Sequence, residues 1–187
     1  MKRSLALVGS ILLAASLHAT KIKNMEVIND KGFKSADYSK LTLISVTADE
    51  FLKDHKDLKN IDAVSSDLLD INLEVKTAVG EYVRSGYTPG KGPKELKMKV
   101  FVSDFNAGSA AAAAFVGFGA GNGMCKYEVH LIDGAADVAS FECTSRIARR
   151  GGNRHPWGGG SDLGGEGSKA RIPKNVALAI EQFLRAH

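Results

Sequence analysis

The chain has 187 residues, with 25 lysines and arginines against 21 aspartates and glutamates and a net charge of +4. Two of the basic residues, Lys2 and Arg3, belong to an N-terminal leader, so the remainder is close to neutral. This balance gives no general reason to expect nucleic acid or an acidic membrane surface as the main partner. The length beyond the leader suffices for one domain with a hydrophobic core.

The N-terminus predicts a cleaved secretion signal. A basic start precedes the uncharged, mostly apolar run Leu5–Leu17, and small residues lead up to Ala19. The run is shorter than the roughly 20 apolar residues of a membrane-spanning helix. We therefore expect cleavage near Ala19 and a mature chain in the periplasm or outside the cell. The first cysteine is Cys125, which excludes a lipid anchor at the cleavage point.

The rest of the chain predicts an extended lead-in over residues 20–40 and a single α+β domain over residues 41–187. Alternating apolar residues predict strands, and apolar residues at three- and four-residue steps predict helices. The expected elements are a strand at Leu41–Val46, a short helix opened by the capping box Thr47-Ala-Asp-Glu50, a helix at Ser66–Tyr87, a strand at Leu96–Asn106, a hairpin with arms at 125–132 and 138–147, and a helix at Ile172–Ala186.

The strands each have one apolar and one polar face. In the strand Leu96–Asn106 the even-numbered apolar positions point one way, and Phe101 and Phe105 interrupt the polar side. The two long helices must bury their apolar faces, so we predict a two-layer domain. It consists of an antiparallel sheet with helices packed on one face.

The two cysteines lie on opposite arms of the predicted hairpin. Because disulfides form in the oxidising compartments that exported proteins reach, we consider a bond between them. With the hairpin axis at Gly134, Cys125 and Cys143 are directly opposed, and a register two residues along makes them diagonal neighbours. In both registers they face the same side. A disulfide and two buried free thiols remain the alternatives.

The uncharged segment 107–123 is rich in glycine and alanine, and Gly117 and Gly121 stand four residues apart. Small residues at this spacing allow close helix contact, which suggests a self-association or membrane-contacting element. The alternative, which we favour, is a glycine-rich crossover against the sheet. A phosphate-binding loop is disfavoured because a strand, and not a helix, follows.

A second glycine-rich loop, over residues 151–167, carries basic residues and one tryptophan. Arg149, Arg150 and Arg154 with Trp157 form a candidate surface for an anionic polymer, in which the arginines neutralise charge and the ring stacks. The alternative, which we favour, is a solvated loop whose tryptophan closes over the sheet.

No catalytic set, cofactor motif or metal-ligand spacing emerges from the sequence. His130, Glu128 and Glu142 share the polar face of the hairpin, but alternation alone produces such a grouping. Cys125 and Cys143 are poor nucleophiles if they face the core. We therefore predict a non-enzymatic protein that acts by binding or assembly, with an enzyme and a binder of anionic polymers as the alternative classes.

One stretch resembles a known family. Phe115-Val-Gly-Phe-Gly-Ala-Gly121, the strand Tyr127–Asp133 and the following Val138-Ala are similar to exported bacterial proteins grouped as domain of unknown function 4410. Many members carry a lipid anchor and the turn Asp-x-Thr-Gly, whereas this chain lacks the anchor and has Asp133-Gly-Ala-Ala. The resemblance implies an envelope location and no known reaction. The expected partner is an envelope protein or a second copy, and no membrane span is expected in the mature chain.

Overall fold

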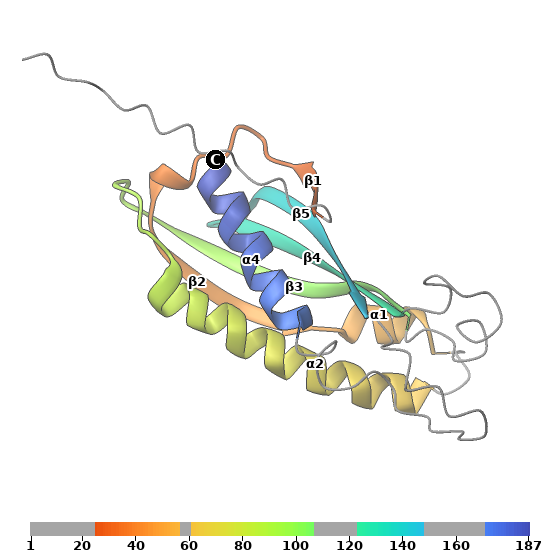
Figure 1. Ribbon diagram of the computed structural model, residues 1–187. Coiled ribbons are helices and arrows are strands. Elements are labelled where there is room, and N and C mark those ends of the chain that lie inside the picture. Colours follow the sequence, from red (N-terminus) through yellow and green to blue (C-terminus); the bar gives the residue numbers. More distant parts are fainter. Residues whose placement is uncertain (1–24, 57–60, 107–122, 148–170) are drawn as a thin grey trace, which may run out of the picture.

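A computed structural model describes residues 25–56, 61–106, 123–147 and 171–187, and these form a two-layer α+β domain (Figure 1). In these residues, five strands form one sheet, and α2 and α4 cover one of its faces. The elements in chain order are β1 (Met25–Asn29), a 3-10 turn (Ser35–Asp37), β2 (Tyr38–Thr47), α1 (Asp49–Asp54), α2 (Ile61–Glu81), a π-helical turn (Tyr82–Gly86), β3 (Lys94–Asn106), β4 (Gly123–Asp133), β5 (Ala136–Ile147) and α4 (Arg171–Ala186).

The sheet has the order β1-β5-β4-β3-β2 and is mostly antiparallel, as predicted. The exception is β2, which pairs parallel to β3, so the sheet is mixed. The connection between β2 and β3 contains α1 and α2. Such a helical crossover returns the chain to the end of the sheet at which β2 began, and the next strand then runs parallel.

β1 lies within the stretch expected as an extended lead-in, and it pairs antiparallel with β5 at the sheet edge. Its pairing is irregular between Val27 and Asn29, and Val27 and Ile28 are exposed. The strand therefore has no apolar–polar alternation that sequence patterning detects.

α2 begins at Ile61, earlier than the predicted start at Ser66. Ser66 resembles an N-cap, but Val64 and Ile61 continue the apolar stripe of Leu68 towards the N-terminus, and the helix extends with them. Its C-terminal end, through a π-helical turn to Gly86, agrees with the prediction.

α1 begins close to the predicted capping box. The Thr47 hydroxyl accepts a hydrogen bond from the backbone N–H of Asp49 at 3.1 Å, although Ala48 occupies the N-cap position. The contact joins the end of β2 to the start of the helix, and this corner forms one wall of the groove described below.

The core lies between the sheet and the two long helices. α4 buries the apolar stripe that its helical spacing predicts to face inward, Val176, Ile180, Phe183 and Leu184. Phe183 stacks on Phe141 of β5 with ring centroids 4.4 Å apart. The inward positions of β3 and β4 are also buried, and Phe105 joins them, contrary to the prediction. An irregularity in the β3–β4 pairing between Val102 and Asp104 shifts the alternation and turns Phe105 to the helix side.

Candidate binding surfaces

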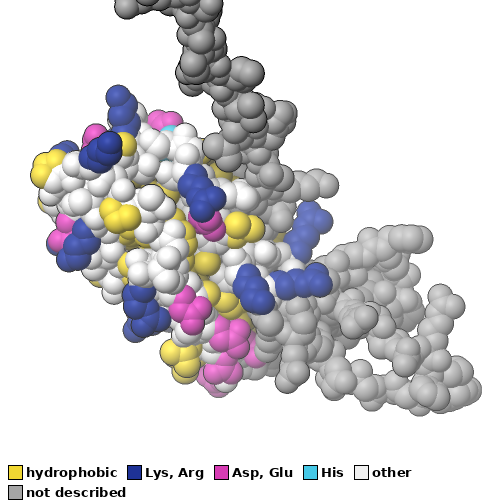
Figure 2. Space-filling view, turned by 60° about the vertical axis from the view of Figure 1, so that its left-hand side comes forward, with side chains coloured by type: hydrophobic (Ala, Val, Ile, Leu, Met, Phe, Trp, Pro, Cys, Tyr) yellow, Lys and Arg dark blue, Asp and Glu magenta, His cyan; other side chains and the backbone are white. Residues whose placement is uncertain are grey.

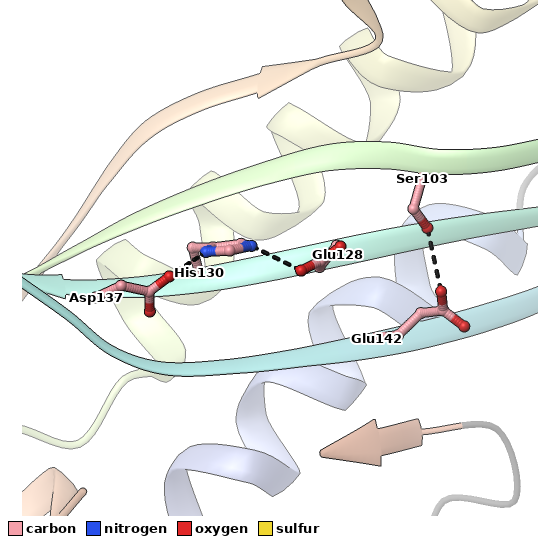
Figure 3. A network of polar contacts seen from close by, with 5 residues as sticks. All are labelled: Ser103, Glu128, His130, Asp137 and Glu142. Carbon is pink, nitrogen blue, oxygen red and sulfur yellow. Dashed lines mark hydrogen bonds and ion pairs between the residues drawn. The ribbon is translucent and has the colours of Figure 1, made fainter. Parts of the chain in front are cut away.

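The sheet face opposite the helices, which we call the open face, carries a polar network (Figure 3). His130 on β4 lies between two carboxylates. Its Nε2 is 2.8 Å from Glu128 Oε1, and its Nδ1 contacts Asp137 Oδ2 on β5. The imidazole also packs on Phe101 of β3, with ring centroids 5.0 Å apart. Both ring nitrogens are thus held by side chains of the same chain.

Glu142 on β5 belongs to the same face but has different partners. Its Oε1 forms an ion pair with Lys126 Nζ at 3.0 Å, and its Oε2 accepts a hydrogen bond from Ser103 at 3.3 Å. The hydrogen bond and charge of Glu142 raise the pKa of Lys126. His130 and Glu142 therefore do not act as one ligand set. Among the described residues, no three His, Cys, Asp or Glu side chains are arranged to hold a metal ion.

A second polar cluster lies where β2 and β3 begin and the β4–β5 hairpin turns. Asp133 Oδ2 is 2.8 Å from Lys94 Nζ and accepts a hydrogen bond from the Tyr38 hydroxyl at 3.2 Å. The hydrogen bond from Lys94 lowers the pKa of Asp133, and burial together with Asp133 raises the pKa of Tyr38. The cluster links the start of β2 to the hairpin turn.

An apolar groove of about 350 Å³ lies between the end of β2, α1 and α2, and we call it the α2 groove. Leu69 and Leu73 of α2 line it, and they are 72% and 66% exposed. They are four residues apart and lie outside the buried stripe of α2, so they share an outward face of the helix. The groove is lined by Val46, Thr47, Ala48, Asp49, Leu52, Ser65, Leu68, Leu69, Asn72, Leu73 and Lys76.

Two polar side chains of the α2 groove are already engaged. The Thr47 hydroxyl caps α1, and Asn72 Oδ1 accepts a hydrogen bond of 2.9 Å from the hydroxyl of the buried Tyr127. The groove contains neither histidine nor cysteine.

Cys125 and Cys143 are buried free thiols on the helix side of the hairpin. The register pairs Cys125 with Ser145 and Cys143 with Tyr127, so the cysteines are the diagonal neighbours of the second predicted register. Burial raises the pKa of each thiol to about 12. The disulfide itself stays a prediction.

The other predicted contact residues lie outside the described residues: Gly117, Gly121, Arg149, Arg150, Arg154 and Trp157. The strand ends that flank these segments are described. Asn106 pairs with Met124, and Gly123 pairs with Ile147, so β3, β4 and β5 meet their glycine-rich connections at one end of the sheet. On the face seen in Figure 2, lysines and arginines alternate with acidic and apolar side chains. Several acidic side chains gather at the lower edge of this view.

A family model for a domain of unknown function, DUF4410, matches residues 16–164, which is most of the chain. The chain belongs to the DUF4410 family. The resemblance found in the sequence is thereby confirmed, and the family description assigns no activity. A search of curated proteins finds no match.

Among solved structures, this DUF4410 protein is similar to the PelC dodecamer from Paraburkholderia phytofirmans. A variant of PelC matches with 10% identity and a TM-score of 0.42, covering 86% of this chain and 95% of that chain. A second PelC structure matches with 11% identity and a TM-score of 0.37, covering 86% and 96%. In the described residues, no helix is both long and apolar enough to cross a membrane.

Proposed function

We propose that this DUF4410 protein is exported to the cell envelope and acts there by binding or assembly, without catalysing a reaction. The α2 groove is the observation that carries the proposal. Exposed single leucines are common on protein surfaces, but two on one helix face beside an apolar groove form a continuous patch. Such patches on soluble domains are typical of surfaces that a partner covers.

The chemistry of the described side chains favours binding over catalysis. A general base needs a free lone pair, but both ring nitrogens of His130 face carboxylates. A cysteine nucleophile reacts as the thiolate, but Cys125 and Cys143 are buried and their raised pKa keeps them protonated. His130, Cys125 and Cys143 are thus unavailable to a substrate.

The leader supports the envelope location, and one experiment tests location and mode of action together. The full chain with a C-terminal tag is expressed in a Gram-negative host, and the periplasm, membranes and medium are separated. We expect a processed chain that starts near Thr20 outside the cytoplasm and sediments as an oligomer or as a complex with an envelope component. An unprocessed cytoplasmic chain would overturn the location, and a processed chain that remains a strict monomer without partners would overturn the mode of action.

A further inference from the structure

We propose that the α2 groove binds a second copy of this chain, with the two α2 helices packed antiparallel about a two-fold axis at the level of Ile71. This inference rests on the proposed function, because it names the partner and the surface of that assembly. It follows from the two exposed leucines of α2, the groove that they line and the distribution of charge on the helix.

The surface is self-complementary. Leu69 and Leu73 are exposed on the outward face of α2 and line the groove, whose other walls are the end of β2 and α1. In an antiparallel pair centred at Ile71, Leu69 of one copy lies opposite Leu73 of the other, and the reverse contact follows by symmetry. A two-fold interface brings the same patch of both copies together, and the antiparallel α2 pair does so by covering the leucines of each copy with those of the other.

The charges on α2 favour the antiparallel direction. α2 carries five acidic residues, Asp62, Asp67, Asp70, Glu74 and Glu81, and one basic residue, Lys76, which lines the groove. Asp62, Asp70 and Lys76 are exposed and form no ion pair with another described residue. About an axis at Ile71, Lys76 lies opposite Ser66 of the other copy, one helical turn from both Asp62 and Asp70. A parallel pair would instead bring the two Lys76 side chains together.

The sheet edges are less suited to self-association. β1 and β2 are the edge strands, and the pairing of each is interrupted by irregularities, between Val27 and Asn29 in β1 and between Leu43 and Ser45 in β2. Short or irregular edge strands resist the addition of a further strand. The helix-lined groove is therefore the better surface for a second copy.

Sedimentation of the mature chain, residues 20–187, over a range of concentrations tests the proposal. We expect a reversible dimer for the unmodified chain. Leu69→Glu and Leu73→Glu should each raise the dimer dissociation constant at least tenfold, because two-fold symmetry places each substitution in the interface once from each copy. Leu178→Glu on α4 is the matched control, since Leu178 is 46% exposed but lies outside the α2 groove, and it should leave dimerisation unchanged.

A charge reversal tests the antiparallel direction. Lys76→Glu should weaken the dimer, and adding Asp70→Lys should restore it, while circular dichroism confirms that each variant is folded. An oligomer that persists unchanged in both leucine variants would overturn the α2 surface but leave assembly through another surface standing. A strict monomer that co-purifies with an envelope component would likewise overturn only the self-association. A monomer without any partner would overturn both proposals.

Discussion

The buried cysteines give a sharp chemical test of the structure. The mature chain is reduced, freed of reductant and mixed with a thiol-reactive disulfide reagent near pH 8, first in native buffer and then in unfolding concentrations of urea. We expect Cys125 and Cys143 to react slowly in native buffer and rapidly in urea. Thr88→Cys supplies an accessible thiol on the same chain as a control, because Thr88 is exposed in the segment between α2 and β3.

The expected rate follows from the pKa values. Burial raises the pKa of each thiol from 9.0 to about 12, so the thiolate fraction near pH 8 falls by about 1000-fold. A more basic thiolate is a better nucleophile, which returns a factor of about 20 to 30 at the usual Brønsted slope. The net effect is a reaction roughly 30- to 50-fold slower, before shielding is counted. Cys125 and Cys143 are only 0% and 5% exposed, so shielding slows the reaction further.

The possible outcomes separate the alternatives. If both cysteines react in native buffer as fast as the thiol of Thr88→Cys, the reasoning on their burial is refuted. Unreduced protein that shows no thiol even in urea would establish the disulfide, the other of the two alternatives. Diagonal neighbours on paired strands are about 7–8 Å apart, wider than the roughly 3.5–4.5 Å that a disulfide requires between Cβ atoms. Formation of the bond would then require a local shift of the hairpin.

Two further predictions concern stability. Tyr127→Phe removes the hydrogen bond to Asn72, so it should lower the free energy of unfolding by about 1 kcal/mol in urea titrations. An unchanged value, or a double-mutant cycle with Asn72→Ala that shows no coupling, would contradict this. Lys94 stabilises the charged form of Asp133 and holds its pKa below the ordinary value. The contribution of Asp133 to the free energy of unfolding is therefore present above the ordinary pKa and is lost as the pH falls through the folded-state pKa. Asp133→Asn should therefore be less stable than the unmodified chain at pH 7, the difference should shrink as the pH falls into the acid range, and a difference that does not shrink would refute the assignment.

The parts of the fold that follow local periodicity could be predicted from the sequence. The alternation in β3, β4 and β5 identifies their buried faces, and the apolar stripe of α4 identifies Val176, Ile180, Phe183 and Leu184 as core residues. In each case the pattern reflects a single face in contact with the core. These elements fix the α+β class and the covered face of the sheet.

The remaining features depend on contacts between distant segments. The side chain of Phe105 faces the core because the β3–β4 pairing shifts by one residue, and a strict two-residue period contains no sign of that shift. The pairing of Asp137 with His130 depends on the register of β5 against β4. The α2 groove needs β2, α1 and α2 together. Leu69 and Leu73 were the available signal for it, since they stand four residues apart and outside the apolar stripe of their helix.

The two candidate surfaces, the open face and the α2 groove, differ in how many of their side chains already have polar partners within the chain. On the open face, His130 contacts Glu128 and Asp137, and Lys126 pairs with Glu142, so a ligand would have to displace these internal contacts. The leucines of the α2 groove have no such partners to give up, and covering them releases water at no cost in hydrogen bonds. Association through the groove should therefore persist at high salt, with only the exposed Lys76 pairs weakened. Binding of an anionic polymer through the arginine-rich loop should instead weaken steeply as salt rises, so salt dependence distinguishes the two modes of binding.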